Sequence, residues 1–185
     1  MRVVSVSGAI EQLIRGGVGV IPTDTIYCIA ARASIEDAVA RVYTLKRRAR
    51  KPGPIIAASV HQLIGLGVEH ALLADREGYW VAGRRATSVE TPMPPRLAYL
   101  HQGTCRQALR VVTDHDTREM LEETGPLLIT SANLPENEPA SNVESAWRYF
   151  QNAVDFYVDG GDLSGRVPSE IIRLKGGRPE VVRPG

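Results

Sequence analysis

The feature that most constrains the fold is an alternation of short apolar segments with segments of helical periodicity. Apolar runs at Val18–Ile21, Ile55–Ala58, Ala108–Val112 and Leu127–Ile129 have the length of buried strands. Between them, apolar residues recur at helical spacing, as they do over 35–45. Strands and helices that mix along one chain predict an α/β fold, in which a twisted, mixed sheet carries flanking helices.

Capping residues mark where the helices of this fold are expected to begin. A Ser, Thr, Asp or Asn before a periodic segment can accept a hydrogen bond from an amide of the first helical turn. The expected caps are Ser7 before a helix over 8–15, Ser34 before 35–45, Ser59 before a further helix, Thr113 or Asp114 before a helix through Glu123, and Ser141, in a capping box with Glu144, before 143–150.

The last part of the chain predicts a β-hairpin. Ile171-Ile172 and Val181-Val182 are strand-like, and Gly176-Gly177 separates them. Before them, apolar residues alternate over 154–158 as in a half-buried strand. The region 72–105 contains several prolines and mixed periodicity, so we expect loops and short elements there.

Composition narrows the classes of function. The 185 residues, 43% hydrophobic and 23% charged, suit one folded domain over residues 1–185. The formal net charge of +1 gives little long-range attraction for DNA, long RNA or an anionic membrane. No apolar run approaches the roughly 20 residues of a spanning helix, and the first residues lack the apolar segment of a signal peptide. Cys28 and Cys105 show no disulfide framework or zinc-ligand spacing, which favours a reducing cytosol.

Polar residues gather just beyond the expected strands, where open α/β sheets bind ligands. Pro22–Tyr27 holds two hydroxyl groups, a carboxylate and a phenol directly after a strand. Thr130–Asn133 follows another strand, and Pro168–Ile172 and Arg183–Gly185 flank the expected hairpin. Each segment is also compatible with an ordinary turn whose side chains bond their own backbone.

The segment Lys46–Lys51 carries five cations in six residues at the expected end of a helix. Cations favour the negative end of a helix, so a solvated helix end is one interpretation. The other interpretation is a polyphosphate clamp, in which Lys supplies a point charge and Arg a bidentate fork.

Taken in order, these segments resemble the YrdC-like family of threonylcarbamoyl-adenylate synthases. The resemblance covers nearly the whole chain. Its elements are Gly17–Tyr27 for the family's Gly-Gly…Pro-Thr-(Asp/Glu)-Thr-Val-Tyr-Gly motif, Lys46 and Arg48 for its Lys-x-Arg pair, Lys51-Pro52 for its Lys-Pro, Thr113-Asp114-His115 for its Asp-His, Thr130–Asn133 for its Thr-Ser-Ala-Asn, and Ser169 with Arg183-Pro184-Gly185 for its closing elements.

The resemblance implies a single-domain YrdC-like fold with a large concave face that holds ATP and L-threonine side by side. It implies that the threonine amine captures carbon dioxide derived from bicarbonate, and that the carbamate attacks the α-phosphorus of ATP. Mg²⁺ would accompany ATP, without a metal ligated by the protein. The product would serve tRNA modification in the cytoplasm, with transfer to tRNA left to another protein.

The resemblance also implies roles for particular residues. The implied catalytic residues are Lys46, Arg48, Ser131 and Asn133. The implied ATP-binding residues are Lys46, Arg48, Lys51, Ser131, Asn133, Ser141 and Arg183, and the implied threonine-binding residues are Thr25, Tyr27, Arg110 and Ser169.

The chain departs from the family pattern around the amino-acid pocket. Val111 stands where the family has its central Arg, with Arg110 beside it, and Pro135 replaces a Ser. Cys28 stands where the family has Gly, so either the backbone is ordinary there and the thiol is a small buried group, or the pocket is narrower. Two further hypotheses remain open: a YrdC-like RNA-binding or ribosome-maturation factor without synthase activity, and an enzyme that forms a different carbamoyl-adenylate.

Overall fold

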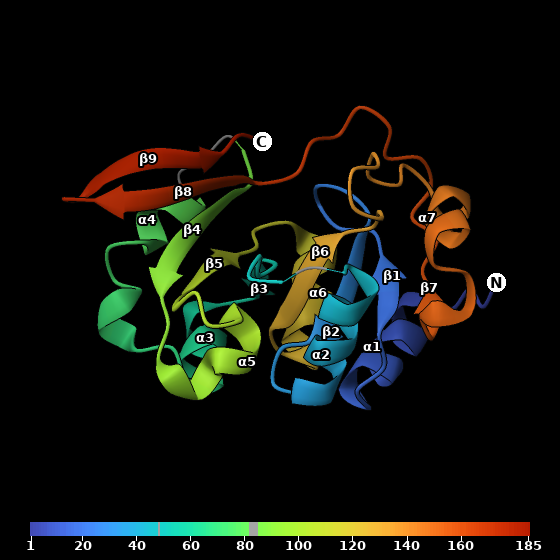
Figure 1. Ribbon diagram of the computed structural model, residues 1–185, viewed down its shortest axis with the longest axis horizontal. Helices are drawn as coiled ribbons and strands as arrows, with labels where there is room; N and C mark the ends of the chain where they lie inside the picture. The colour runs from blue at the N-terminus through green and yellow to red at the C-terminus, as the bar shows by residue number, and fades with distance from the viewer. Residues whose placement is uncertain (48, 82–84) are drawn as a thin grey trace.

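One mixed sheet runs through the computed structural model, which describes all residues except 48 and 82–84. The sheet has nine strands in the order β7-β1-β2-β6-β3-β5-β4-β8-β9. Figure 1 shows the β8–β9 hairpin at one end of this sheet and β7 at the other. The strands are β1 (Gly19–Ile21), β2 (Cys28–Arg32), β3 (Ile55–Ala57), β4 (Thr87–Pro92), β5 (Arg106–Val111), β6 (Leu127–Ser131), β7 (Phe156–Tyr157), β8 (Glu170–Lys175) and β9 (Arg178–Arg183).

Strand pairing confirms the expected mixed α/β sheet. Parallel pairs join β1 to β7, β3 to β5 and β4 to β8. The remaining pairs are antiparallel. The predicted hairpin is confirmed as β8–β9, and its turn residues Gly176 and Gly177 have φ of 56° and 75°. Two successive positive φ values suit a tight hairpin turn, which glycine adopts at little steric cost.

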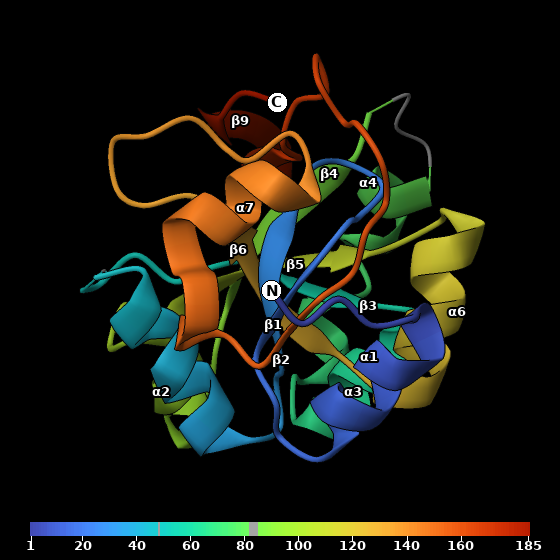
Figure 2. The ribbon, with the colours of Figure 1, turned by 90° about the vertical axis from the view of Figure 1, so that its right-hand side faces the viewer.

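Helices cover both faces of the sheet, as Figure 2 shows for α1 and α6 on one side and α2 and α7 on the other. Buried residues of α1 and α6 share one hydrophobic cluster, and those of α2 and α7 share another. Among the described residues no helix has the length and apolarity needed to cross a membrane. The helices are α1 (Val6–Ile14), α2 (Glu36–Leu45), α3 (Val60–Leu66), α4 (Glu77–Val81), α5 (Ala98–His101), α6 (His115–Thr124) and α7 (Val143–Phe150), with short 3₁₀ segments at His70–Leu72, Pro95–Leu97 and Gln151–Ala153.

Several predicted helix caps are wrong by one or two residues. Ser5 rather than Ser7 caps α1, and α2 begins after Ile35 without a side-chain cap. The capping box of α7 is formed by Asn142 and Ser145, not by Ser141 and Glu144. The capping residue is the one whose extended backbone directs its side chain at the first free amides, which composition alone does not settle. The predicted caps Ser59 and Asp114 are confirmed.

Two strands lie where the sequence predicted none. Cys28–Arg32 forms β2 directly after the polar segment 22–27, and it pairs with both β1 and β6. Within the region 72–105, Thr87–Pro92 forms β4 between β5 and β8. Their small or polar residues hide the period-two pattern that identifies a strand, so long-range pairing decides their structure.

Candidate functional site

A small cavity brings together polar residues from distant parts of the chain. Its volume is about 120 Å³, and its lining includes Thr25, Ser131, Ser169 and Arg183. These residues come from the loop after β1, the end of β6, the residue before β8 and the end of β9. The four polar segments beyond the strands therefore each contribute a side chain to one place, as the rule for strand ends predicts, whereas the basic segment Lys46–Lys51 contributes none.

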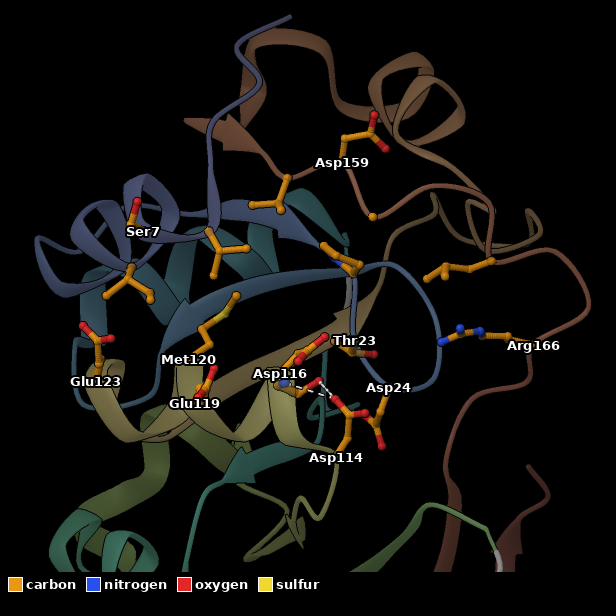
Figure 3. Close-up of a pocket in the computed structure, with 17 residues that line it drawn as sticks. Ser7, Thr23, Asp24, Asp114, Asp116, Glu119, Met120, Glu123, Asp159 and Arg166 are labelled. Atoms are coloured by element: carbon orange, nitrogen blue, oxygen red, sulfur yellow. Dashed lines mark hydrogen bonds between the residues drawn. The ribbon is translucent and has the colours of Figure 1, made fainter.

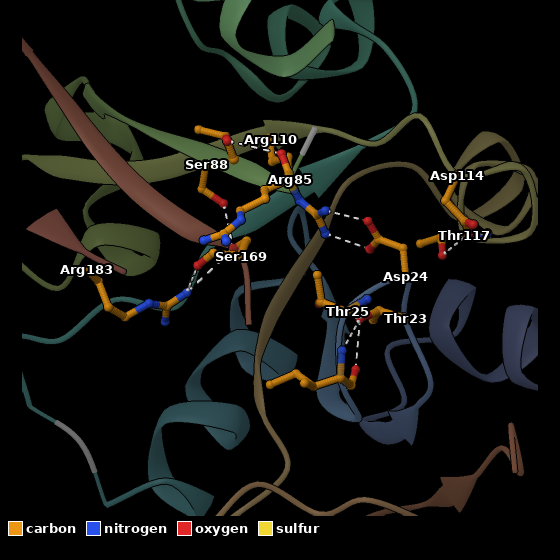
Figure 4. Close-up of polar contacts among 12 residues, drawn as sticks. Thr23, Asp24, Thr25, Arg85, Ser88, Arg110, Asp114, Thr117, Ser169 and Arg183 are labelled. Atoms are coloured by element: carbon orange, nitrogen blue, oxygen red, sulfur yellow. Dashed lines mark hydrogen bonds and ion pairs between the residues drawn. The ribbon is translucent and has the colours of Figure 1, made fainter. Parts of the chain in front are cut away.

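Ser169 is fixed between two neighbours at this cavity. Its hydroxyl lies 3.0 Å from that of the buried Ser88 on β4. Arg183 donates from Nη2 to the Ser169 carbonyl oxygen, with the Ser169 hydroxyl at 3.5 Å. Figure 4 shows the Arg183 guanidinium directed at Ser169. A half-buried guanidinium beside hydroxyl groups is a suitable binding site for phosphate or carboxylate oxygens.

The loop after β1 presents Thr25 to the same cavity. The Thr23 hydroxyl donates to the Ile26 carbonyl oxygen at 2.8 Å, which uses its single hydrogen. The Thr25 hydroxyl, 3.0 Å from that of Thr23, must therefore be the donor in that pair. Its lone pairs remain able to accept a hydrogen bond from a ligand.

A close backbone approach forms one wall of the cavity. The Ile129 amide donates to the Pro54 carbonyl oxygen at 2.9 Å, which holds the segment 52–54 against β6. A Cβ atom on Gly53 would lie 2.3 Å from the Ile129 carbonyl oxygen. Only glycine permits this approach without a backbone shift.

Lys46 lies behind the Thr130–Asn133 turn rather than on the surface. Its side chain is fully buried, and its ammonium donates to the Ser131 carbonyl oxygen at 2.7 Å and to Asn133 Oδ1 at 2.6 Å. It also donates to the Asn133 carbonyl oxygen. The Ser131 hydroxyl donates to the same Asn133 Oδ1 at 2.7 Å. In this structure, Lys46 braces the turn that carries Ser131 and does not present a free charge to solvent.

The other residues expected at ATP do not line this cavity. Lys51 is exposed, and its backbone amide donates to Gln102 Oε1 at 3.0 Å. Ser141 is half-buried just before α7, where its carbonyl oxygen accepts from the Leu163 amide. Asn133 is buried, and its amide nitrogen donates to the Asn137 carbonyl oxygen. Arg48 lies outside the described residues.

Arg110 on β5 forms a bidentate ion pair with Asp24 in the loop after β1. The two nitrogen–oxygen distances are 2.6 and 2.8 Å, and the two side chains are 4% and 17% exposed. Figure 4 shows the Arg110 guanidinium directed at the Asp24 carboxylate, beside Thr25. Val111 lines a different cavity, with Trp80 and residues of α3. The Arg110 side chain therefore lies on the face of β5 that meets the loop after β1, and the Val111 side chain lies on the other face.

Tyr27 is not brought to the small cavity. It is fully buried, its hydroxyl donates to the Gly161 carbonyl oxygen at 2.9 Å, and it accepts from the Gly160 amide at 2.7 Å. Burial raises the pKa of the phenol, and the Gly160 hydrogen bond opposes this rise. The phenol thus holds the loop after β7 against the residue that precedes β2.

Cys28 begins β2 and lines the small cavity opposite Ser131. Its φ is not positive, so the backbone is ordinary at the position where the family has glycine. Burial raises the pKa of its thiol to about 12, although the positive charge of Arg110 opposes the shift. The thiol is therefore neutral near pH 7 and behaves as a small buried group.

A larger cavity of about 660 Å³ lies on the other side of the 22–24 loop, between α1, α6 and the loop after β7. Figure 3 shows carboxylates of α6 at its edge, with Arg166 approaching from the opposite loop. Its charged lining residues are Asp24, Asp114, Asp116, Glu119, Glu123, Asp159 and Arg166. A triphosphate would be repelled by this excess of negative charge, which makes the larger cavity a poor binding site for a polyanion.

The described part of the chain contains no group of three or more His, Cys, Asp or Glu residues that could hold a metal ion. Sequence reasoning gave no role of their own to Asp24 and Gly53, which the structure brings to the site. Asp24 was within the Pro22–Tyr27 segment, but only its pairing with Arg110 shows its position in the site.

A family model for Sua5, YciO and YrdC proteins, described as "Telomere recombination", matches residues 11–185. The chain belongs to this family. A putative threonylcarbamoyl-AMP synthase of Mycobacterium tuberculosis H37Rv is 32% identical over 191 residues, covering 99% of this chain and 83% of that protein. A threonylcarbamoyl-AMP synthase of Pseudomonas aeruginosa PAO1 is 34% identical over 166 residues, covering 85% of each.

Solved structures of the family share the fold. Pyrococcus abyssi Sua5 complexed with L-threonine superposes with a TM-score of 0.84 at 24% identity, over 97% of this chain. The match spans 54% of that longer chain. Escherichia coli YciO superposes with a TM-score of 0.77 at 24% identity, covering 96% of this chain and 87% of that one. The predicted YrdC-like architecture is therefore confirmed.

Proposed function

We propose that this protein is a threonylcarbamoyl-AMP synthase, which forms L-threonylcarbamoyladenylate and pyrophosphate from L-threonine, bicarbonate and ATP. The observation that carries the proposal is the convergence of Thr25, Ser131, Ser169 and Arg183 on one small cavity. They come from separate motifs of a family whose relatives include threonylcarbamoyl-AMP synthases. The small volume suits an amino acid, with the bulk of ATP extending outside it.

The reaction needs positioned groups more than a protein nucleophile. The threonine nitrogen forms a bond to carbon dioxide and loses a proton, and a carbamate oxygen then displaces pyrophosphate at the α-phosphorus. Arg183 is proposed to hold anionic oxygens during this displacement, and the Ser131 hydroxyl to join it once it has exchanged its hydrogen bond to Asn133 Oδ1 for one to the substrate. The Lys46 ammonium keeps the Ser131–Asn133 turn rigid and makes the surrounding potential more positive.

Mg²⁺ is proposed to enter with ATP. This ion commonly retains water molecules and binds substrate phosphates with few protein ligands, which suits a site lined by hydroxyl groups. It would supply neutralising charge on the phosphates. The direct contribution of the chain is to hold the substrates and to exclude water through the apolar wall that Ile26 and Ile129 provide.

The product is proposed to serve tRNA threonylcarbamoyladenosine synthesis, with transfer to tRNA carried out by other proteins. A cytoplasmic location is inferred for this role. The two cysteines are free in the structure, which agrees with a reducing compartment.

Incubation with ATP, bicarbonate and threonine, followed by measurement of pyrophosphate, tests the proposal. Pyrophosphate release should require all three substrates, and omitting threonine or bicarbonate should abolish it. Ser131→Ala should reduce the rate, whereas Ser164→Ala, which changes an exposed serine, should not. Release with a different amino acid but not threonine would instead identify another carbamoyl-adenylate-forming enzyme. Failure to bind ATP, together with binding of a structured RNA at physiological salt, would favour an RNA-binding factor.

A further inference from the structure

The segment 52–54 forms a wall of the small cavity, and its backbone can make few hydrogen bonds. Pro52 and Pro54 have no backbone N–H, so Gly53 carries the only amide hydrogen of the segment. All three residues line the cavity. The Pro54 carbonyl oxygen accepts from the Ile129 amide, which holds one end of the wall against β6. The position of the middle of the wall therefore depends on what binds Gly53.

Gln107 on β5 holds the middle of this wall. Its side chain is fully buried, and its amide nitrogen donates to the Gly53 carbonyl oxygen. Its Oε1 is also buried, and it has no hydrogen-bond partner in the part of the chain that the structure describes. An apolar side chain of similar size would avoid the free-energy cost of that unpaired oxygen. Core stability alone therefore does not explain a glutamine at this position, whereas the hydrogen bond to Gly53 does.

Gln107 reaches the wall from the face of the sheet opposite to the Arg110–Asp24 pair. Residues 107 and 110 are three apart on β5, so their side chains point to opposite faces. Leu109 shares the face of Gln107 and belongs to the same hydrophobic cluster as Tyr43 of α2. Gln107 itself does not line the cavity, so it can act on a ligand only through Gly53.

Tyr43 on α2 binds the other backbone group of Gly53. Its hydroxyl donates its single hydrogen to the Leu100 carbonyl oxygen, so it accepts in its other hydrogen bonds. Burial raises the pKa of the phenol, and hydrogen bonds with the Gly53 backbone and the Gln107 side chain oppose this rise. The phenol oxygen therefore accepts from the Gly53 amide. Side chains from two distant elements thus hold both the carbonyl group and the amide of Gly53.

We propose that Gln107 is a positioning residue of the substrate cavity, which holds the 52–54 wall where it fits the amino acid, with Tyr43 as its partner. The inference rests on the proposed function, which makes an amino acid the ligand of this cavity. The cavity volume is only about 120 Å³, so a small shift of one wall changes its fit to a ligand. Gly53 adds to the constraint, because a side chain at this position would collide with the Ile129 carbonyl oxygen.

Gln107→Leu tests this role through threonine binding. Calorimetry with a non-hydrolysable ATP analogue present should show a roughly three- to tenfold loss of threonine affinity, the effect of about one neutral hydrogen bond. In the pyrophosphate assay the threonine KM should rise by a similar factor. The kcat should stay close to that of the wild type, because Gln107 touches no reacting atom.

Gln62→Leu is the matched control. Gln62 on α3 also donates to a backbone carbonyl oxygen, that of Leu121 at 2.6 Å, and accepts from the Ala58 amide at 2.9 Å. It lines neither the small cavity nor the larger one. This variant should lower the Tm but leave threonine affinity unchanged. An equal loss of threonine affinity in Gln62→Leu and Gln107→Leu would overturn the proposal, because the loss would then follow from stability alone.

Hydrogen exchange of the Gly53 amide, followed by NMR of protein labelled with ¹⁵N-glycine, measures the wall without any substrate. This amide should exchange faster in Gln107→Leu and in Tyr43→Phe than in the wild type. Tyr43→Phe keeps the packed ring and removes only the hydroxyl, so the test does not depend on the folding of one variant. Tyr157→Phe is its control, because the buried Tyr157 hydroxyl also donates to a backbone carbonyl oxygen, that of Gln151 at 2.8 Å, outside both cavities. Unchanged exchange in both Gln107→Leu and Tyr43→Phe, or faster exchange with unchanged threonine affinity, would overturn the proposal.

The same measurements separate this inference from the proposed function. If Gln107→Leu weakens threonine binding but the wild-type protein forms no adenylate, the proposed function fails and the positioning role stands. If adenylate forms and Gln107→Leu keeps the wild-type threonine KM, the inference fails and the proposed function stands. If threonine does not bind the wild-type protein, both fail.

Discussion

Lys46→Ala should lower the stability of the free protein, before any effect on ATP. The family resemblance alone predicts a surface clamp, whose loss would weaken ATP binding roughly ten- to a hundredfold. In the structure the ammonium is fully buried and donates to three oxygens of Ser131 and Asn133. The substitution therefore removes both a buried charge and a long packed side chain.

The size of the stability loss in Lys46→Ala depends on which oxygens, among those that accept hydrogen bonds from the ammonium, keep another donor. Asn133 Oδ1 retains the Ser131 hydroxyl, and the Ser131 carbonyl oxygen retains the Asn133 amide. The main losses are thus the Asn133 carbonyl contact, worth about 1–3 kcal/mol when left unsatisfied, and the packing of the aliphatic stem. Release of the ammonium from burial offsets part of this. We expect a net loss of about 2–5 kcal/mol, by analogy with Met→Ala in a core, which corresponds to a fall in Tm of roughly 4–20 °C for a domain of this size.

Thermal unfolding followed by circular dichroism, without ligands, measures this loss. Lys51→Ala is the matched control, because Lys51 belongs to the same basic segment but is exposed, and its change should stay within about 0.5 kcal/mol. A Lys46→Ala protein with the Tm of this control, but without ATP binding, would refute the reasoning. It would show that the ammonium of the free protein faces solvent.

Three further predictions concern other buried or paired groups. Tyr27→Phe removes both hydrogen bonds to the loop after β7, so it should lower the free energy of unfolding in urea by about 1–3 kcal/mol and leave the threonine KM unchanged. An increased KM with normal stability would place the phenol at the substrate. Because burial raises the Cys28 pKa to about 12, maleimide should label only Cys105 in the folded protein and both thiols in urea, as mass spectrometry can show; rapid double labelling of folded protein would contradict this. Burial opposes ionisation of Asp155, but its hydrogen bonds to Arg41 and to a backbone amide lower its pKa below the ordinary 3.8. The stability that the ionised carboxylate contributes is therefore present at neutral pH and is lost as the pH falls through that lowered pKa. Asp155→Asn should reduce this loss of stability in acid by less than about 1 kcal/mol, given solvent screening, and an unchanged pH profile of stability would contradict the assignment.

The strands that could be predicted are those with a strong local apolar signal. The segments 18–21, 55–58, 108–112 and 127–129 each contribute to a strand of the sheet, because short segments made mainly of apolar residues suit strands that are buried on both faces. β2 escaped prediction because Cys28–Arg32 follows a polar loop and ends in Arg, and only its pairing with β1 and β6 stabilises it as a strand.

Some residues of the candidate site could also be predicted from the sequence, and others could not. Thr25, Ser131 and Ser169 could be placed together, because each follows or precedes a strand and strand ends meet at one edge of a sheet. The burial of Lys46 could not, since the same basic segment at a helix end suits either solvent or a turn packed against it. The Arg110–Asp24 pair could not be predicted either, because the two-residue period of a strand indicates only that Arg110 and Val111 point to opposite faces.

Mass spectrometry of the adenylate formed from isotopically labelled bicarbonate tests the central claim most directly. The account predicts an ATP-dependent product that contains threonine, AMP and the labelled carbon, and that disappears when bicarbonate is omitted. An unlabelled threonyl-adenylate, or threonine-independent cleavage of ATP, would contradict it.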